Sequence, residues 1–203
     1  MSPAISETLV LASASKARAR ILAAAGISVT VDAAAIDENE TKAAFRREGR
    51  DAAACAAALA EAKAMHAAAR HPGELVIGCD QILDLEGVWF DKPRDPADLR
   101  RQLEILRGRQ HELVSAVAVV AGGTVLWQRV EHARLAMRHF SDAFLADYLA
   151  VMGDQALAMP GGYALEGLGG QLFTEVEGDY FSILGLPLLP LLDFLRRRGA
   201  LAQ

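Results

Sequence analysis

This sequence has few cysteines, and it lacks a long apolar run and an initial basic segment that leads into an apolar one. Its 203 residues include two cysteines, Cys55 and Cys79, too few for a disulfide framework or a cysteine-based zinc site. No uninterrupted apolar run reaches the roughly 18 residues of a membrane span, so we expect no membrane partner. Residues 1–7 contain no basic segment followed by an apolar one, so we expect no signal peptide and a cytoplasmic protein.

The sequence is also short of positive charge. Lysine and arginine together number 21 against 26 aspartate and glutamate residues, which gives a net charge of -5. A protein that binds the phosphate backbone of a nucleic acid needs a basic face, so this balance argues against a nucleic acid polymer as a partner. It is compatible with a small anionic ligand held by a few local cations.

Apolar, strand-like runs and helical patterns interleave along the rest of the chain. They lack strict β-α-β regularity, and turns at 86–87 and 122–123 predict hairpins and therefore antiparallel strand pairs. We predict an α/β fold with a mixed, partly antiparallel sheet flanked by helices, in a single domain over residues 1–203. One helical pattern, at 41–48, follows an acidic turn at 36–40.

The most informative stretch is residues 74–81, an apolar run with strand character that ends on Asp80. Desolvating a carboxylate costs several kcal/mol unless the charge is paired or bound to a metal. Twelve residues later Lys92 precedes Pro93, after a short predicted hairpin. A metal with a phosphate nearby would explain Asp80, although Lys92 on its own is also compatible with an exposed turn residue.

A second group of polar residues lies where an early strand gives way to a helix. Ser13, Ser15, Lys16 and Arg18 occupy this transition, where backbone N–H groups and the positive end of the helix dipole favour phosphate. The alternative is that Ser15 only caps the helix and the cations are solvated. The chain lacks the Gly-x-x-x-x-Gly-Lys-Ser/Thr pattern, so this is no P-loop.

Three further candidates have equally ordinary alternatives. Glu38 follows Asp37 in the acidic turn, where solvated acids are common. Lys63 lies on an alanine-rich helical segment, where a lysine is usually at the surface. Glu166 lies in a glycine-rich segment, 159–170, that is flexible enough to approach a ligand closely.

Two residues with reactive side chains receive no catalytic role. We expect Cys79 to be a small buried neighbour, because nothing suggests a base poised to activate it. His111 opens a predicted strand, where a histidine is more often structural, so it is left outside the site.

Taken in order, these segments resemble the Maf family of nucleoside triphosphate pyrophosphatases, whose fold is related to that of the inosine triphosphate pyrophosphatases. The resemblance runs from about Leu9 to Leu195. Its motifs here are Leu-Ala-Ser-x-Ser at 11–15 with Arg18, the acidic pair 37–38, the lysine helix 59–64, Gly-x-Asp at 78–80, Lys-Pro at 92–93, Leu-x-Gly-x-x-His at 106–111, and the glycine segments 162–167 and 178–187.

The resemblance implies two lobes around a central cleft, a homodimer, and hydrolysis of a nucleoside triphosphate to the monophosphate and pyrophosphate. It implies catalytic roles for Glu38, Lys63, Asp80 and Lys92, with Arg18 and its neighbours at the phosphates. Glu38 and Asp80 supply oxygen ligands suited to Mg²⁺, with Mn²⁺ as an alternative. Asp80 is also a candidate for the base that orients the attacking water. The sequence does not distinguish this role from that of a metal ligand.

The residues that would set base specificity differ from one branch of the family to another. The branch that prefers dTTP and UTP has Thr after the central Asp and Gln in the late glycine loop, where this chain has Gln81 and Glu166. That pairing resembles the branch acting on 7-methyl-GTP, and a carboxylate can accept from the N1–H and N2–H₂ donors of a guanine edge. The family often has proline and then an arginine or aromatic residue at the positions of Lys16 and Ala17, so Lys16 is a candidate substitute there.

The favoured function is therefore a house-cleaning pyrophosphatase acting on modified nucleotides. Two alternatives stay open: a pyrophosphatase that prefers dTTP or UTP, and a nucleotide-binding regulatory protein, tied to cell division or septum formation, with little turnover. The retention of Glu38, Lys63, Asp80 and Lys92 favours an enzyme, because a pure binder has no need of a carboxylate that activates water.

Overall fold

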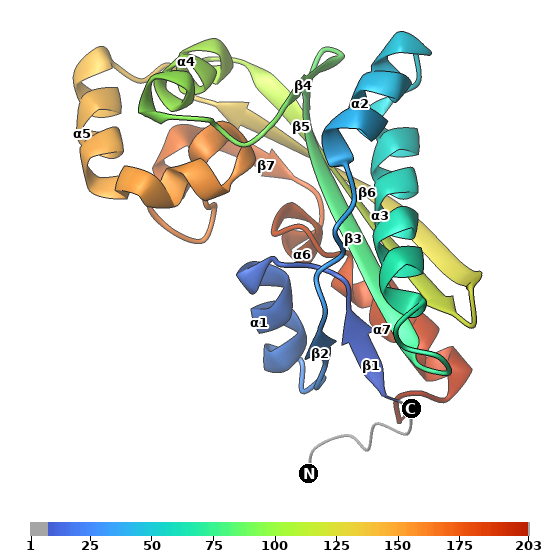
Figure 1. Ribbon diagram of the computed structural model, residues 1–203. Coiled ribbons are helices and arrows are strands. Elements are labelled where there is room, and N and C mark those ends of the chain that lie inside the picture. Colours follow the sequence, from blue (N-terminus) through green and yellow to red (C-terminus); the bar gives the residue numbers. More distant parts are fainter. Residues whose placement is uncertain (1–7, 203) are drawn as a thin grey trace. The chain divides into compact units, whose positions relative to one another are not determined.

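The computed structural model describes residues 8–202 (Figure 1). Residues 1–7, where no signal peptide is expected, lie outside the described residues. The strands are β1 Leu9–Leu11, β2 Thr30–Val31, β3 Leu75–Leu85, β4 Val88–Phe90, β5 Gln110–Ala121, β6 Thr124–Met137 and β7 Phe173–Glu177. The α-helices are α1 Lys16–Ala24, α2 Glu38–Arg47, α3 Ala52–Ala68, α4 Pro96–Leu106, α5 Asp142–Met152, α6 Tyr180–Ile183 and α7 Leu188–Arg198.

The strands of the described residues form one seven-stranded sheet in the order β2-β1-β3-β5-β6-β7, with β4 paired to β3. β1 pairs in parallel with both β2 and β3, whereas β3 with β4 and β6 with β7 are antiparallel. The predicted mixed, partly antiparallel sheet flanked by helices is confirmed. The arrangement of two lobes around a central cleft stays a prediction.

The described chain divides into two compact units. The first comprises residues 8–81, 115–131 and 179–202, and the second comprises 82–114 and 132–178. Strands β3, β5 and β6 each contribute residues to both units. That the two units act as one domain stays a prediction.

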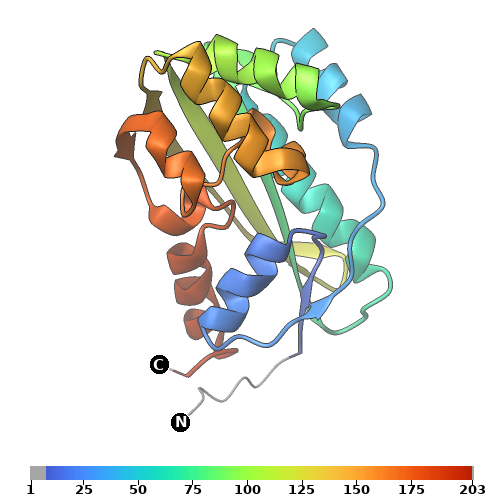
Figure 2. The same cartoon turned by 90° about the vertical axis from the view of Figure 1, so that its left-hand side faces the viewer.

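The core of the first unit lies on both faces of β1 and β3. Side chains alternate along a strand, so Leu11 and Ile77 join α1 and α7 through Leu22 and Leu191, while Val10 and Val76 join the alanines of α3. Figure 1 shows α3 running alongside β3, and Figure 2 shows α1 (blue) and α7 (dark red) on the other side of the strands from α3 (teal). Burial on both faces explains why these strands are nearly continuous apolar runs.

The second unit carries more irregular structure than the sequence suggested. Its short 3₁₀ segments are η1 Gly153–Ala158, η2 Pro160–Gly162 and η3 Leu168–Leu172, and α4 packs against the first two. The glycine-rich segment expected to be a loop at 159–170 is therefore held in short helical turns at both ends. Within residues 8–202, no helix is long and apolar enough to cross a membrane.

The acidic turn expected at 36–40 is instead the beginning of α2, which starts three residues before the predicted helix. Asp37 is the N-cap, and its Oδ1 accepts a hydrogen bond from the N–H of Glu40 at 2.9 Å. Carboxylates in a first helical turn are stabilised by the unsatisfied N–H groups and the helix dipole. The correction places Glu38 on a helix rather than in a turn.

Candidate active site

A buried lysine lies between two carboxylates in the first unit. The Nζ of Lys63 is 2.6 Å from Oδ1 of Asp80 and 2.8 Å from Oε1 of Glu38. Lys63 is 8% exposed and Asp80 4%, so the alternative of a surface lysine does not hold. The structure thus brings three of the predicted catalytic residues together, from α2, α3 and β3.

Regular secondary structure positions this cluster. Lys63 shares the buried face of α3 with Leu59, Ala60, Ala64 and Ala67. On β3, strand alternation places Asp80 two residues after Gly78 on the face that α3 covers. Small side chains on both elements allow α3 to approach the strand closely, so that a lysine in mid-helix reaches the acid.

The cluster has one more negative charge than positive, and one of its oxygens has no partner. Oδ1 of Asp80 accepts from Lys63, but Oδ2 is buried without a hydrogen-bond partner among residues 8–202. Leaving a buried carboxylate oxygen unpaired is expensive, so this atom points to a ligand that supplies positive charge or a proton.

The donor set fits a divalent cation of the Mg²⁺ type. Mg²⁺ is usually held by one or two carboxylates together with waters and substrate phosphates, rather than by a full protein cage. In the part of the chain that the structure describes, no group of three or more His, Cys, Asp or Glu side chains could hold a metal ion. The two carboxylates beside Lys63, one with a free buried oxygen, match the partial coordination that Mg²⁺ needs.

Arg18 joins three separate segments of the same unit. Its Nε donates to the carbonyl of Gly185 at 2.7 Å, and its Nη1 donates to the carbonyl of Cys79 at 2.9 Å and to Oγ of Ser13 at 3.0 Å. Arg18 therefore fixes the residue before Asp80 in addition to offering positive charge at the start of α1.

The two serines of the strand-to-helix transition are bonded locally. Oγ of Ser15 accepts from the N–H of Arg18 at 3.4 Å, so Ser15 caps α1. This capping role is the one that the alternative to a phosphate site assigned to Ser15. Oγ of Ser13 accepts from the N–H of Ser15 at 3.3 Å. Lys16 is exposed and Ala17 half-buried in the first turn of α1. Capping by Ser15 is compatible with an anion at this helix end.

Gln81 is held by its amide nitrogen, a contact that the sequence did not reveal. Nε2 lies 2.9 Å from Oγ of Ser115, 3.1 Å from the carbonyl of Ser182 and 3.0 Å from that of Ile183. With its N–H donors used in this way, Gln81 retains its carbonyl oxygen as an acceptor for a ligand. In the sequence, Ser115 stands out only as a hydroxyl residue inside a long apolar strand. Nothing in the sequence marks Ser182 as a partner of Gln81.

The remaining two predicted site residues belong to the second unit. Lys92 is exposed between β4 and α4, and Glu166 is exposed between η2 and η3. Their roles stay predictions.

Cys79 and His111 are unsuited to acid–base or nucleophilic work. Burial raises the pKa of the Cys79 thiol to about 11, which keeps it protonated. His111 is buried with its Nε2 2.6 Å from the hydroxyl of Tyr163, and desolvation lowers its pKa to about 4. His111 also packs against the rings of Tyr163 and Phe173, so its place is in the core of the second unit.

Stability is expected to fall in mild acid because of His111. Its folded-state pKa of about 4 lies below the ordinary value of 6.5, so the unfolded chain binds more protons between these values. The contribution is fully present above pH 6.5 and is lost as pH falls toward 4, by up to about 3 kcal/mol. Denaturant unfolding of wild type and His111→Gln at pH 7 and pH 4.5 measures it. Equal losses in the two proteins would show that His111 is not the responsible group.

Comparisons with known proteins find similarity over nearly the whole chain. Residues 8–198 match the family described as Maf-like protein. A nucleoside triphosphate pyrophosphatase of Paramagnetospirillum magneticum is 54% identical over 192 residues, which cover 95% of this chain and 99% of that protein. Another of the same name, from Granulibacter bethesdensis, is 51% identical with 95% and 98% covered. A 7-methyl-GTP pyrophosphatase of Rhizobium johnstonii is 47% identical with 95% and 97% covered.

Proposed function

Because the chain belongs to the Maf family, we propose that it is an enzyme that hydrolyses a nucleoside triphosphate to the monophosphate and pyrophosphate, with 7-methyl-GTP as the favoured substrate. The observation that carries the proposal is the buried cluster of Glu38, Lys63 and Asp80. A pure nucleotide binder would gain nothing from a desolvated carboxylate with an unpaired oxygen, whereas hydrolysis needs a group that orients and deprotonates water.

Each residue of the cluster has a proposed task. Glu38 and Asp80 hold a divalent cation, Mg²⁺ or Mn²⁺, which when bound neutralises phosphate charge and lowers the pKa of a water. Lys63 pairs with both carboxylates through Oε1 of Glu38 and Oδ1 of Asp80, which leaves Oδ2 of Asp80 to accept the proton of the attacking water.

Phosphate binding is proposed for the start of α1 and for one residue of the second unit. The hydroxyls of Ser13 and Ser15 and the charges of Lys16 and Arg18 lie at or beside the helix N-terminus, where free N–H groups favour an anion. Lys92 is proposed to neutralise the charge that develops on the leaving pyrophosphate.

The proposal is tested by measuring pyrophosphate release with Mg²⁺ and a panel of 7-methyl-GTP, GTP, dTTP and UTP. We expect release, fastest from 7-methyl-GTP. Binding of a nucleotide without release from any of them would refute the enzyme and support the regulatory alternative, whereas the fastest release from dTTP or UTP would refute the base preference only.

Specificity for a guanine base is proposed for Ala17, Gln81 and Glu166. Glu166→Gln is expected to lower kcat/KM for 7-methyl-GTP by about 10- to 100-fold, because an amide oxygen replaces a charged acceptor of the guanine N–H donors. Rates with dTTP should not fall. Glu175→Gln, the same change at an exposed position of β7, is the control and should match wild type. An unchanged ratio of the two substrates in Glu166→Gln would refute this base contact.

The proposed setting is the cytoplasm and the proposed assembly a homodimer, with no nucleic acid polymer as a partner. The homodimer is proposed from the family, and the absence of a nucleic acid partner from the acidic net charge of -5. Light scattering of the purified full chain tests the assembly directly.

A further inference from the structure

Helix α4 buries two polar side chains one turn apart. Asp98 is 7% exposed and Gln102 6%, on a face that is otherwise made by Leu99, Leu103 and Leu106. Burying polar groups is unfavourable unless they are hydrogen-bonded. An apolar residue at either position would avoid the free-energy cost of desolvating a polar group. The hydrogen bonds that Asp98 and Gln102 make must therefore account for their burial.

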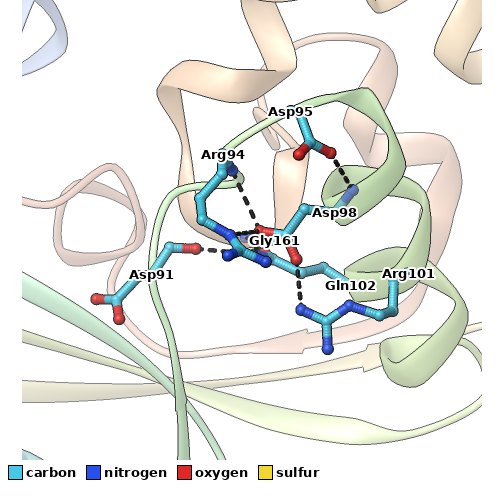
Figure 3. A network of polar contacts seen from close by, with 7 residues as sticks. All are labelled: Asp91, Arg94, Asp95, Asp98, Arg101, Gln102 and Gly161. Atoms are coloured by element: carbon cyan, nitrogen blue, oxygen red, sulfur yellow. Dashed lines mark hydrogen bonds and ion pairs between the residues drawn. The ribbon is translucent and has the colours of Figure 1, made fainter.

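Gln102 uses both ends of its amide on two different segments. Its Nε2 donates to the carbonyl of Asp91 at 3.1 Å, and its Oε1 accepts from the N–H of Gly161 at 3.3 Å (Figure 3). Asp91 immediately precedes Lys92. Gly161 lies in the glycine-rich segment 159–170, which also contains Glu166. One buried amide therefore joins the backbone of the Lys92 segment to the backbone of the Glu166 segment.

Asp98 holds the other end of the Lys92 segment. Its Oδ2 accepts from the backbone N–H of Arg94 at 3.1 Å and lies 3.5 Å from Nε2 of Gln102, and its Oδ1 accepts from the guanidinium of Arg101 (Figure 3). The hydrogen bond from Arg101 holds the pKa of the Asp98 carboxyl below its usual range, so Asp98 is ionised. The residues on both sides of Lys92-Pro93 are thus bonded to the buried face of α4.

The glycine segment has little freedom to adjust on its own. Gly161 has φ +70, and a Cβ there would lie 2.7 Å from Leu83 and 2.8 Å from the ring of Tyr163. The carbonyl of Gly162 accepts from the hydroxyl of Tyr148 at 2.9 Å. The contact with Gln102 therefore acts on a segment whose backbone is already confined.

We propose that Gln102 is a positioning residue, which fixes Lys92 and Glu166 relative to each other so that a nucleotide meets a preset pair of phosphate and base contacts. The inference rests on the proposed function. It adds a residue of α4 that touches no substrate and acts through the two segments it joins. Asp98 supports it by holding the Arg94 end of the Lys92 segment.

Two variants separate positioning from packing. Gln102→Met keeps the volume but removes both hydrogen bonds, and we expect kcat/KM to fall about 100-fold, with an increase in KM, since small misplacements of binding groups have effects of this size. Gln102→Glu keeps the acceptor for Gly161 but loses the donor to Asp91. The control is Gln110→Glu, the same change at an exposed position of the same unit, which should match wild type.

The pH dependence of kcat/KM in Gln102→Glu separates positioning from packing. If Gln102 served only to fill space, the ratio of variant to wild-type kcat/KM would not change with pH. The introduced carboxyl would face Asp98, and the like charge raises its pKa. Once protonated it can donate again to the Asp91 carbonyl, so the ratio of variant to wild-type kcat/KM should rise about tenfold between pH 8 and pH 6. A ratio that stays flat while both proteins remain folded would overturn the proposal, as would wild-type kcat/KM in Gln102→Met.

Hydrogen exchange makes the test independent of turnover. In Gln102→Met we expect amides of 91–94 and 161–167 to exchange about tenfold faster, with the β-strands unchanged, because each segment loses one anchor. If wild type releases no pyrophosphate, the proposed function fails, and exchange still decides this inference. Unchanged exchange in both segments would overturn it.

Discussion

Replacing Asp80 with asparagine is expected to lower kcat/KM for triphosphate hydrolysis by about 1000-fold, the usual loss when a general base or its charge is removed. Asparagine keeps the shape of the side chain, and its oxygen can accept from Lys63 as Oδ1 of Asp80 does at 2.6 Å. It places an amide nitrogen, however, where Asp80 offers its unpaired Oδ2. An amide nitrogen neither binds a divalent cation nor accepts a proton from water.

Asp80→Asn should fold, because Lys63 keeps a second partner. Removing one member of a buried ion pair usually leaves a costly unpaired charge, but Nζ of Lys63 also lies 2.8 Å from Oε1 of Glu38. Circular dichroism and denaturant unfolding check this, and pyrophosphate release measures the activity. Asp84→Asn is the matched control on the same strand, since its Oδ1 accepts from the N–H of Gly87 and an amide oxygen can do the same. Activity in Asp80→Asn within tenfold of the control would remove Asp80 from the mechanism.

The order of strands and helices was accessible from the sequence because local rules determine it. Apolar runs and the two hairpin turns predicted elements that the structure contains. The beginning of α2 was missed although a local signal existed, the acidic N-cap Asp37. A solvated acidic turn and an acid-capped helix start look alike unless the capping pattern is considered.

Asp80 could be singled out from the sequence because a carboxylate buried in an apolar strand needs a charged partner or a bound metal. The structure places it in the middle of β3 rather than at the end of the strand. Its partner Lys63 could not be distinguished from a surface lysine, because α3 is so rich in alanine that no apolar stripe marks its buried face.

Contacts between distant segments had no sequence signal at all. Arg18 and Gly185 are 167 residues apart, and Gln81 and Ser182 are 101 apart. Gln102 reads as an ordinary polar residue of an amphipathic helix, and only the approach of two loops to its side chain gives it a task. Such partners depend on tertiary packing, which neither propensity nor periodicity contains.

Gly78→Ala is expected to have the largest effect on stability, a loss of about 3 kcal/mol or more, the upper end for overpacking. A Cβ at this position would lie 2.0 Å from the carbonyl oxygen of Ala60 and 2.7 Å from the backbone nitrogen of Ala64. These are backbone atoms inside the 17-residue helix α3, so no side-chain rotation relieves the clash and the helix itself must move. Denaturant unfolding measures the loss.

The same displacement should impair catalysis in whatever fraction of Gly78→Ala remains folded. Lys63 lies between Ala60 and Ala64, so a shift of α3 away from β3 draws its Nζ away from Asp80. Gly73→Ala is the control: Gly73 has φ +84, a Cβ there meets nothing within 4 Å among the described residues, and the expected loss is the backbone strain of about 1–2 kcal/mol, with activity unchanged.

The double variant Gly78→Ala with Ala64→Gly decides which contact limits the approach of helix to strand. Ala64→Gly removes the Cβ that would lie 2.9 Å from the new methyl group but leaves the Ala60 carbonyl at 2.0 Å, so neither stability nor activity should recover. Recovery in the double variant would mean that side-chain crowding sets the distance between α3 and β3. The glycine of the Gly-x-Asp motif would then be required by a neighbouring methyl group, rather than by the helix backbone that carries Lys63 to Asp80.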